Sequence, residues 1–364
     1  MSSLVVSDTS GAAAGSALGS DLTERSAKSM EEDPLVSVII PCFNGEAFLK
    51  ATIESALAQS YPRVEIIVVD DGSTDHSGEI AQSFPVRYIH QPNRGLTPSR
   101  NLGIQESRGS YLVFLDADDR LMPEAIEAGL RLLVRRPECA LTVGDHLFVS
   151  EDGSYLANSG KTFLPARHYE ALLKSNCFEM ISSILFRRSI FDQVGGFDPE
   201  LRVAEDYDLY LRIARDHAIC FHPAVVAEYR MHQGNASHNS GLMLIMTLQV
   251  LKSHRLYIRS HPGLLLAYLE GTRNWRRQYG RQLASELART FSTLQAGDLR
   301  RKILLLAVHY PQGLLLFLLL RIMPSLNKRK TGKGREGASE QRPLLQRVHA
   351  WLNASKPQSS AQIG

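Results

Sequence analysis

The stretch Tyr111-Leu112-Val113-Phe114-Leu115-Asp116-Ala117-Asp118-Asp119 decides the fold of this chain. Its apolar part, residues 111–115, predicts a buried strand, so the acids that follow lie at the strand's C-terminal end. Open α/β sheets bind their ligands at that edge. Three acids in four positions repel one another unless a cation or ligand hydroxyls take up their charge. Such a cluster suits Mg²⁺ or Mn²⁺ holding a phosphate-bearing substrate, and the alternative is a solvated acidic turn before a helix.

The flanking sequence predicts an α/β fold with a mostly parallel central sheet flanked by helices. From Leu35 onward, apolar runs alternate with amphipathic stretches, which is the pattern of strands joined by crossover helices. We expect strands at 36–40, 64–69, 86–89, 111–115, 140–145, 180–186 and 225–229, and helices at 123–135, 166–175 and 205–215. Asn44 and Thr97 are the expected N-caps of two further helices, and a hairpin is expected to turn at Asp152-Gly153.

Composition excludes some classes of protein. The formal net charge of +3 over 364 residues is too small to indicate nucleic-acid binding. The cysteines, Cys42, Cys139, Cys177 and Cys220, are widely separated, so neither a zinc site nor a disulfide scaffold is expected, and a reducing cytosol fits best. The N-terminal 33 residues show no signal-peptide pattern and read as a disordered tail.

A second acidic loop, Asp70-Asp71, follows the strand at 64–69 and is expected at the same edge. There, Asp71 could accept the imide N–H of uracil, and the flat aromatic ring of Phe43 could stack on the base. Arg100, in the first turn of a helix, could pair with phosphate oxygens, and a surface ion pair is its alternative role. No Gly-x-Gly-x-x-Gly follows a strand and no Gly-Lys-Ser/Thr phosphate loop is present, which disfavours dinucleotide and NTPase functions.

Two further candidates lie near the end of this region. Glu205 and Asp206 begin a predicted helix, whose dipole favours their ionised forms, and a carboxylate there can act as a general base. Acids that merely decorate the helix start are the alternative. His232 follows the strand at 225–229 and could bind a metal or phosphate, or be an ordinary loop histidine.

These motifs together resemble the family 2 glycosyltransferases, whose fold is GT-A. The matching segments are Val36-Ser37-Val38-Ile39-Ile40-Pro41-Cys42-Phe43-Asn44, Val68-Val69-Asp70-Asp71-Gly72-Ser73-Thr74-Asp75, Asn93-Arg94-Gly95, Ser99-Arg100-Asn101-Leu102-Gly103, Leu115-Asp116-Ala117-Asp118-Asp119, Gly195-Gly196-Phe197-Asp198 and Glu205-Asp206. Because they occur in order over about residues 35–235, the match is specific. Phe43 stands where the family often has Tyr, so a hydroxyl contact is absent there.

The resemblance implies an inverting, metal-dependent hexosyl transfer from a nucleotide-diphospho-sugar to an acceptor hydroxyl. It implies that Asp206, with Glu205, supplies the catalytic base, and that a divalent cation (Mn²⁺ or Mg²⁺) is held among Asp116, Asp118, Asp119 and His232. The expected donor-binding residues are Pro41, Phe43, Asn44, Asp70, Asp71, Arg100 and Asp116.

The expected partners are a UDP-sugar and a glycan or lipid-linked acceptor, with no nucleic acid, in cell-envelope or surface-polysaccharide synthesis. Two rival functions are a nucleotidyltransferase-like nucleotide-sugar enzyme and a non-catalytic nucleotide-sugar-binding module. The first is disfavoured because Pro41-Cys42-Phe43-Asn44 occupies the place of its Gly-rich, basic triphosphate loop, and the second because the acids at 71, 116, 118 and 206 are intact.

The predicted domains are a disordered tail (1–33), the catalytic domain (34–240), a helical basic and Leu-rich region (241–326) and a flexible basic tail (327–364), with a short helix at 343–352. His309, Pro311, Gln312 and Gly313 interrupt the apolar run at 303–323. That run could lie on the membrane, pack on the catalytic domain or span the bilayer. The expected location is cytoplasmic, with peripheral contact to the inner leaflet through residues 300–330.

Overall fold

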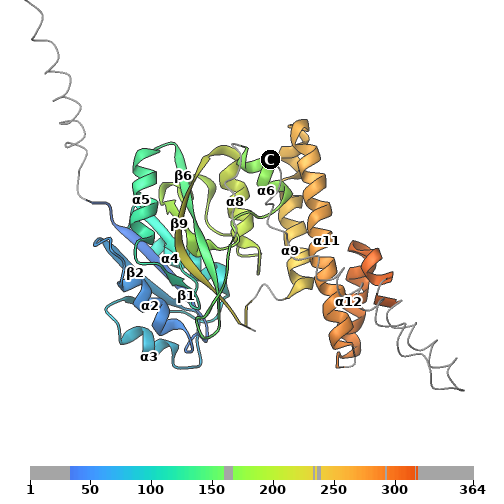
Figure 1. Cartoon of the computed structure of the whole chain (residues 1–364), viewed down its shortest axis with the longest axis horizontal. Helices are drawn as coiled ribbons and strands as arrows, with labels where there is room; N and C mark the ends of the chain where they lie inside the picture. Colours follow the sequence, from blue (N-terminus) through green and yellow to red (C-terminus); the bar gives the residue numbers. More distant parts are fainter. Residues whose placement is uncertain are drawn as a thin grey trace, which may run out of the picture.

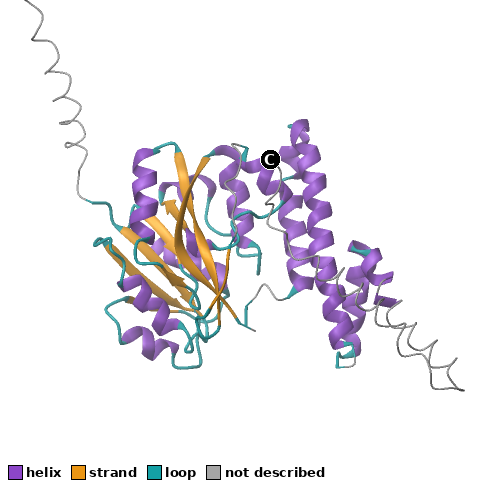
Figure 2. Ribbon diagram, viewed as in Figure 1, coloured by secondary structure: helices purple, strands orange, loops and turns teal. Residues whose placement is uncertain are grey.

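A computed structural model describes residues 33–159, 167–232, 234–235, 239–291, 293–315 and 317–318. Within these residues, a central twisted sheet is flanked by helices, and a further group of helices follows it (Figure 1, Figure 2). The expected α/β class with a helical C-terminal extension is confirmed. The helix expected at 343–352 and almost all of both predicted tails lie outside the described residues.

The sheet runs in the order β3-β2-β1-β4-β8-β6-β9-β5, with β7 paired to β6. The strands are β1 (Val36–Cys42), β2 (Val64–Asp70), β3 (Arg87–His90), β4 (Tyr111–Phe114), β5 (Arg120–Leu121), β6 (Cys139–Ser150), β7 (Tyr155–Asn158), β8 (Ile184–Arg187) and β9 (Ala218–Met231). The predicted hairpin is confirmed, because β6 and β7 pair around a turn in which Gly153 N–H donates to the Ser150 carbonyl.

Strand direction explains where the site forms. β3, β2, β1 and β4 are mutually parallel, β8 is antiparallel to both β4 and β6, and β9 is parallel to β6. β1, β2, β4 and β9 therefore all point the same way, although β9 is far from the others in sequence. The residues that follow them are brought to one edge of the sheet.

The helices are α2 (Leu49–Leu57), α3 (Ser77–Gln82), α4 (Leu96–Glu106), α5 (Ala125–Arg135), α6 (His168–Lys174), α7 (Ser189–Val194), α8 (Glu205–Asp216), α9 (Ser240–Ser253), α10 (Arg255–Arg259), α11 (Leu265–Thr290) and α12 (Ala296–His309), with 3-10 turns at Ile181–Ser183 and Pro262–Leu264. The predicted strand at 180–186 is thus partly a 3-10 turn, with β8 beginning at Ile184.

Two apolar cores cover the two faces of the sheet. Val36, Val38 and Ile40 of β1 contribute to one core, whereas Ile39 faces the other. This is the period-two alternation of a strand that is buried on both sides. Each face must then be covered by helices, as the apolar run in the sequence predicted.

The first C-terminal helices share a core with the sheet. α9 and α11 lie side by side next to α6 and α8 (Figure 1), and Leu244 and Trp275 belong to the same apolar cluster as Ile39. α12 packs instead on the second half of α11, where Leu306 and Leu287 are fully buried. No helix within the described part of the chain is both long and apolar enough to cross a bilayer.

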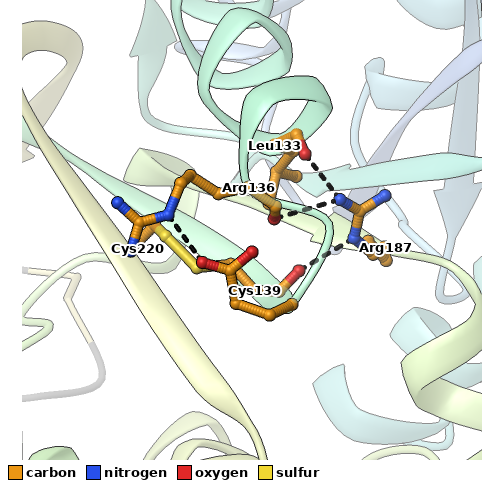
Figure 3. The surroundings of a disulfide bond; sticks show 6 residues. Leu133, Arg136, Cys139, Arg187 and Cys220 are labelled. Atoms are coloured by element: carbon orange, nitrogen blue, oxygen red, sulfur yellow. Dashed lines mark hydrogen bonds and ion pairs between the residues drawn. A yellow bond between two sulfur atoms is a disulfide. The ribbon is translucent and has the colours of Figure 1, made fainter.

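A disulfide joins Cys139, at the start of β6, to Cys220 in β9, with 5.9 Å between their Cα atoms (Figure 3). Nearby, Arg187 donates to the carbonyls of Cys139 and Leu133. No local motif indicates this bond, because its partners are 81 residues apart and meet only through the parallel pairing of β6 and β9. The expectation that the cysteines form no disulfide is therefore wrong for this pair.

The two predicted N-caps are also wrong. α2 begins at Leu49 with no side-chain cap, and the Asn44 side chain accepts the N–H of Thr74 instead. Gly95 is the N-cap residue of α4, and the Thr97 hydroxyl donates to the Leu201 carbonyl. In both cases, the polar side chain that the local sequence assigned to a helix end instead forms a hydrogen bond with a segment that is distant in sequence.

Candidate active site

The loops after β1 and β2 are tied together at the candidate edge. Asn44 has a positive φ of 52°, its N–H donates to Ser73 Oγ at 2.9 Å, and its side chain accepts the Thr74 N–H at 2.8 Å. The preceding Phe43, which directly follows Cys42 at the end of β1, leaves 52% of its surface exposed. A free aromatic face on a fixed loop is what base stacking requires.

Asp70 and Asp71 are both buried, and each holds a neighbouring loop. Asp70 accepts the Ser73 N–H at 2.9 Å and the Tyr88 hydroxyl at 2.6 Å. Asp71 accepts the backbone N–H groups of Arg94 at 2.9 Å and Gly95 at 2.7 Å. Asp71 therefore anchors the loop that leads into α4. The Gln91 side-chain Nε2 also donates to Asp71 Oδ1 at 2.7 Å, so about one of the four acceptor positions of this carboxylate is left for a ligand N–H.

The loop after β4 presents its acids differently. Asp119 is buried, and its oxygens accept from Arg230 N–H at 3.0 Å and from the Ser182 hydroxyl at 3.3 Å. Asp116 and Asp118 are partly exposed, and Asp118 Oδ2 lies 2.8 Å from His232 Nε2. Asp119 thus fixes the loop from within, and Asp116, Asp118 and His232 face the edge.

Charge is crowded in this loop. Burial raises the pKa of Asp118, with a further contribution from Asp116, against the hydrogen bond with His232. Burial and its two acidic neighbours raise the pKa of Asp119 well above the usual value. A bound cation would relieve this repulsion, and carboxylate and imidazole are suitable ligands for it. Within the described residues, however, no three such side chains are arranged as a ready metal site.

Sequence analysis missed Arg230, which is buried and organises this loop. Besides the bond to Asp119, its Nε donates to the Asp118 carbonyl at 3.0 Å and its Nη1 to the Glu151 carbonyl at 2.7 Å. Its guanidinium also lies 5.1 Å from the ring centre of Phe48. The signal available was its place two residues before His232, at the end of an apolar strand.

Arg100 is buried and forms a bridge between two carboxylates. Its Nη2 donates to Asp116 Oδ1 at 2.5 Å, and its Nη1 pairs with Glu205. The guanidinium carbon lies 5.4 Å from the Phe197 ring centre. The surface ion pair considered from sequence is excluded by this burial. Its pairing with phosphate stays a prediction, since both terminal nitrogens already hold protein carboxylates.

Asp206 is the second residue of α8, whose N-cap is the strained residue Ala204, with a φ of 61°. Non-glycine residues in this left-handed region are uncommon and cluster at functional sites. Burial, reinforced by the charge of Glu205, raises the pKa of Asp206 to about 7, although Arg100 opposes the shift. The helix dipole was expected to favour the ionised form, but burial outweighs it. A carboxyl that titrates near neutral pH is suited to proton transfer.

Hydrogen bonds and ion pairs thus connect the predicted residues along one edge of the sheet. Asn44 links the β1 loop to the β2 loop, Asp118 meets His232, which directly follows β9, and Arg100 links the β4 loop to α8. The acids of this edge do not line the cavity of about 500 Å³ beside α8 and α10, whose walls include Arg215 and Tyr257. The candidate site is therefore this sheet edge and not that cavity.

Known proteins resemble the chain as follows. A profile of Glycosyl transferase family 2 matches residues 37–195. An uncharacterized glycosyltransferase of Rickettsia typhi is 32% identical over 221 residues, covering 57% of this chain and 67% of that protein. The uncharacterized glycosyltransferase EpsJ of Bacillus subtilis is 33% identical over 204 residues, covering 50% of this chain and 57% of EpsJ. The crystal structure of S. aureus TarS 1-349 has a TM-score of 0.49 and 19% identity, over 75% of this chain and 79% of TarS.

Fold, site and relatives together define a glycosyltransferase. The chain belongs to glycosyl transferase family 2, as its ordered motifs indicated. The curated relatives are matched over about a third to two thirds of their own length. What the whole protein transfers, and to what, is therefore a matter for proposal.

Proposed function

We propose that this protein is an inverting, metal-dependent hexosyltransferase that moves a sugar from a UDP-sugar to an acceptor hydroxyl. The observation that carries the proposal is the junction at Arg100, which ties the acidic loop after β4 to the helix that begins with Glu205 and Asp206. The buried guanidinium of Arg100 thereby holds the loop after β4, which is assigned to the donor, in a fixed position relative to the start of α8, which is assigned to the catalytic base.

The donor is assigned to the loops after β1, β2 and β4. Phe43 stacks on the base, Asp71 accepts its imide N–H, and Asp116 takes ribose hydroxyls. Pro41, Asn44 and Asp70 shape these loops. The exposed ring of Phe43 and the remaining acceptor capacity of Asp71 support these roles.

A divalent cation is assigned to Asp118 and His232, with Asp116 next to them. The crowding that raises the pKa of Asp118 supports a cation here. When bound, Mn²⁺ or Mg²⁺ offsets charge on the departing diphosphate. Asp119 has a supporting role, because its oxygens already accept from Arg230 and Ser182.

Asp206 is assigned as the general base, with Glu205 as its positioning neighbour through Arg100. It takes the proton of the acceptor hydroxyl while that oxygen attacks the anomeric carbon from the face opposite the leaving diphosphate. A single displacement of this kind inverts the configuration and needs no covalent intermediate. A pKa of about 7 leaves a useful fraction of Asp206 ionised at neutral pH.

The C-terminal region is assigned a membrane contact on the cytoplasmic face, which suits a lipid-linked acceptor in cell-envelope polysaccharide synthesis. Around α12, Leu304, Val308 and Leu315 are exposed, together with Arg300 and Arg301. The opposite side of this segment packs on α11 through Leu306 and other buried side chains. Exposed leucines with adjacent arginines favour an anionic bilayer surface.

Vesicle sedimentation tests this contact. We expect the L304S/V308S/L315S variant to lose most binding to vesicles that contain phosphatidylglycerol, whereas Leu256→Ser, an equally exposed change on α10, retains it. Equal binding by both variants would assign the contact elsewhere.

A panel of nucleotide sugars tests the reaction. We expect the full-length protein with Mn²⁺ to release nucleoside diphosphate from one UDP-sugar, and Asp118→Ala to abolish this release. Asp206→Asn should keep affinity for UDP, measured by calorimetry, while transfer is lost. If Asp206→Asn instead loses UDP affinity, Asp206 is a binding residue. The same panel also tests the nucleotidyltransferase and binding-module alternatives.

A further inference from the structure

We propose that Trp275 of α11 is a positioning residue for the catalytic base, acting through Tyr207 to hold the start of α8. The inference rests on the proposed role of Asp206. It gives the C-terminal helices a part in the reaction that is separate from any membrane contact.

The link consists of consecutive contacts among buried side chains. Trp275 Nε1 donates to the Tyr207 hydroxyl at 3.3 Å, and the two rings lie 5.5 Å apart in an edge-to-face arrangement. The Tyr207 backbone N–H in turn donates to Asp206 Oδ1 at 2.7 Å. Tyr207 is therefore both the residue that α11 contacts and the residue whose backbone N–H holds the Asp206 carboxylate in place.

The Tyr207 hydroxyl also ties α8 to α6, because it donates to the Leu172 carbonyl at 2.6 Å. α11 also packs on α6. A Cβ atom at Gly271 would lie 1.8 Å from the Leu173 carbonyl oxygen, so only glycine permits this approach. Asn274 adds a hydrogen bond to the Lys174 carbonyl at 3.2 Å. Helices α6, α8 and α11 thus meet at Tyr207, with little freedom to shift.

The surroundings of Asp206 come from several elements. Glu205 on α8, Arg100 on α4 and Asp116 after β4 supply its charged neighbours. Tyr210 on α8 and Tyr279 on α11 complete the wall, and burial together with the field of Asp206 raises the pKa of both hydroxyls. Tyr279 stacks on Trp275 with ring centres 5.4 Å apart. α11 therefore contributes to the environment of the base as well as to its position.

Removing the indole leaves Tyr207 without its partner and opens a cavity behind the first turn of α8. The donor loops lie on other elements and are not touched by this change. We therefore expect Trp275→Ala to lower kcat at least 10-fold while the affinity for UDP changes less than 2-fold. Trp275→Phe keeps most of the ring packing and should recover most of the lost kcat.

Leu287→Ala is the matched control, because Leu287 is also fully buried on α11 but packs toward α12. It should lower stability without changing kcat. Hydrogen exchange provides a readout that does not need turnover. The peptide covering residues 203–210 should exchange at least 10-fold faster in Trp275→Ala and at the normal rate in Leu287→Ala.

Unchanged exchange of 203–210 in Trp275→Ala would overturn the inference, as would parallel losses of kcat and UDP affinity. An equal effect of Leu287→Ala would overturn it too, since the role would then be general stability. If Asp206→Asn retains transfer, the proposed base is wrong, whatever Trp275 does. Failure of the proposed function and failure of this inference are thus told apart.

Discussion

Arg100 Nη2 lies 2.5 Å from Asp116 Oδ1, and the same guanidinium pairs with Glu205 through Nη1. These carboxylates belong to the loop after β4 and to the first turn of α8, which are about 90 residues apart in sequence. The arginine is buried, so its pair with the buried Glu205 is shielded from solvent and salt, whereas the Asp116 side chain is partly exposed. Arg100 therefore directly connects the loop assigned to the donor with the helix that carries the proposed base.

Arg100→Met should be strongly destabilising, because it leaves Glu205 as a buried, unpaired charge. Removing one partner of a buried pair costs about 3–5 kcal/mol. Urea unfolding measures the loss. Arg131→Met is the control, since the exposed Arg131–Glu127 pair on α5 should contribute little to stability. Similar unfolding free energies for the two variants would mean that the bridge is not a structural element.

Transfer should depend on pH through Asp206. Because burial raises the pKa of Asp206 to about 7 and the base acts when deprotonated, the rate should rise from pH 5.5 and level off near pH 8. Initial rates at saturating donor measure the profile. A rate that is flat across this range would contradict Asp206 as the base.

The same shift sets the sign of a stability effect. A carboxyl whose pKa is higher in the folded than in the unfolded protein holds its proton more tightly when folded. The stability that this carboxyl contributes at low pH is therefore lost as pH rises toward 7. Asp206→Asn removes this loss. Its melting temperature relative to wild type should therefore be higher at pH 8 than at pH 4, by about 2–4 °C for each kcal/mol. A constant difference across pH would show that Asp206 titrates normally.

His232 should strengthen cation binding, because its Nε2 lies 2.8 Å from Asp118 Oδ2. Because His232 is assigned both as a ligand and as the partner that orients Asp118, its loss should weaken metal binding by at least the roughly 10–100-fold that is typical of losing an orienting partner alone. Calorimetric titration of Mn²⁺ into the UDP complex should show this for His232→Ala. His76→Ala, which removes an exposed histidine paired with Glu46, is the control. Equal Mn²⁺ affinity in both would remove His232 from the cation site.

The Cys139–Cys220 bond should stabilise the pairing of β6 with β9. It closes a loop of 81 residues, which corresponds to about 4–5 kcal/mol in the chain-entropy treatment. Cys139→Ser with Cys220→Ser should lower the unfolding free energy by up to that amount, and reducing agent should affect only the wild type. Cys42→Ser, at a buried free cysteine, controls for lost packing. Insensitivity of the wild type to reductant would show that the bond does not form in solution.

Much of the fold could be predicted because its central strands are buried on both faces. Runs such as residues 66–69 are apolar throughout, so both their strand conformation and the place of the acids after them follow from composition. The cluster at 116–119 was located for this reason. That one acid of this cluster is buried and two face the edge could not be predicted from sequence, since the difference depends on Arg230 and Ser182, which are distant in sequence.

The same limit explains the other differences. Asn44 and Thr97 were assigned as caps from local pattern, but loops that meet only in the folded chain engage both side chains. The disulfide follows from the register of two distant strands. The raised pKa of Asp206 comes from burial by several elements, whereas sequence shows only the helix start. Contacts across long sequence separations thus set the chemistry of the site.

Release of UDP from a panel of UDP-sugars tests the central claim most directly. With full-length protein and Mn²⁺, we predict that one UDP-sugar is turned over, that EDTA stops the reaction, and that Asp206→Asn binds UDP but transfers no sugar. Turnover that persists undiminished in Asp206→Asn, or an absence of UDP binding by the wild type, would contradict the account.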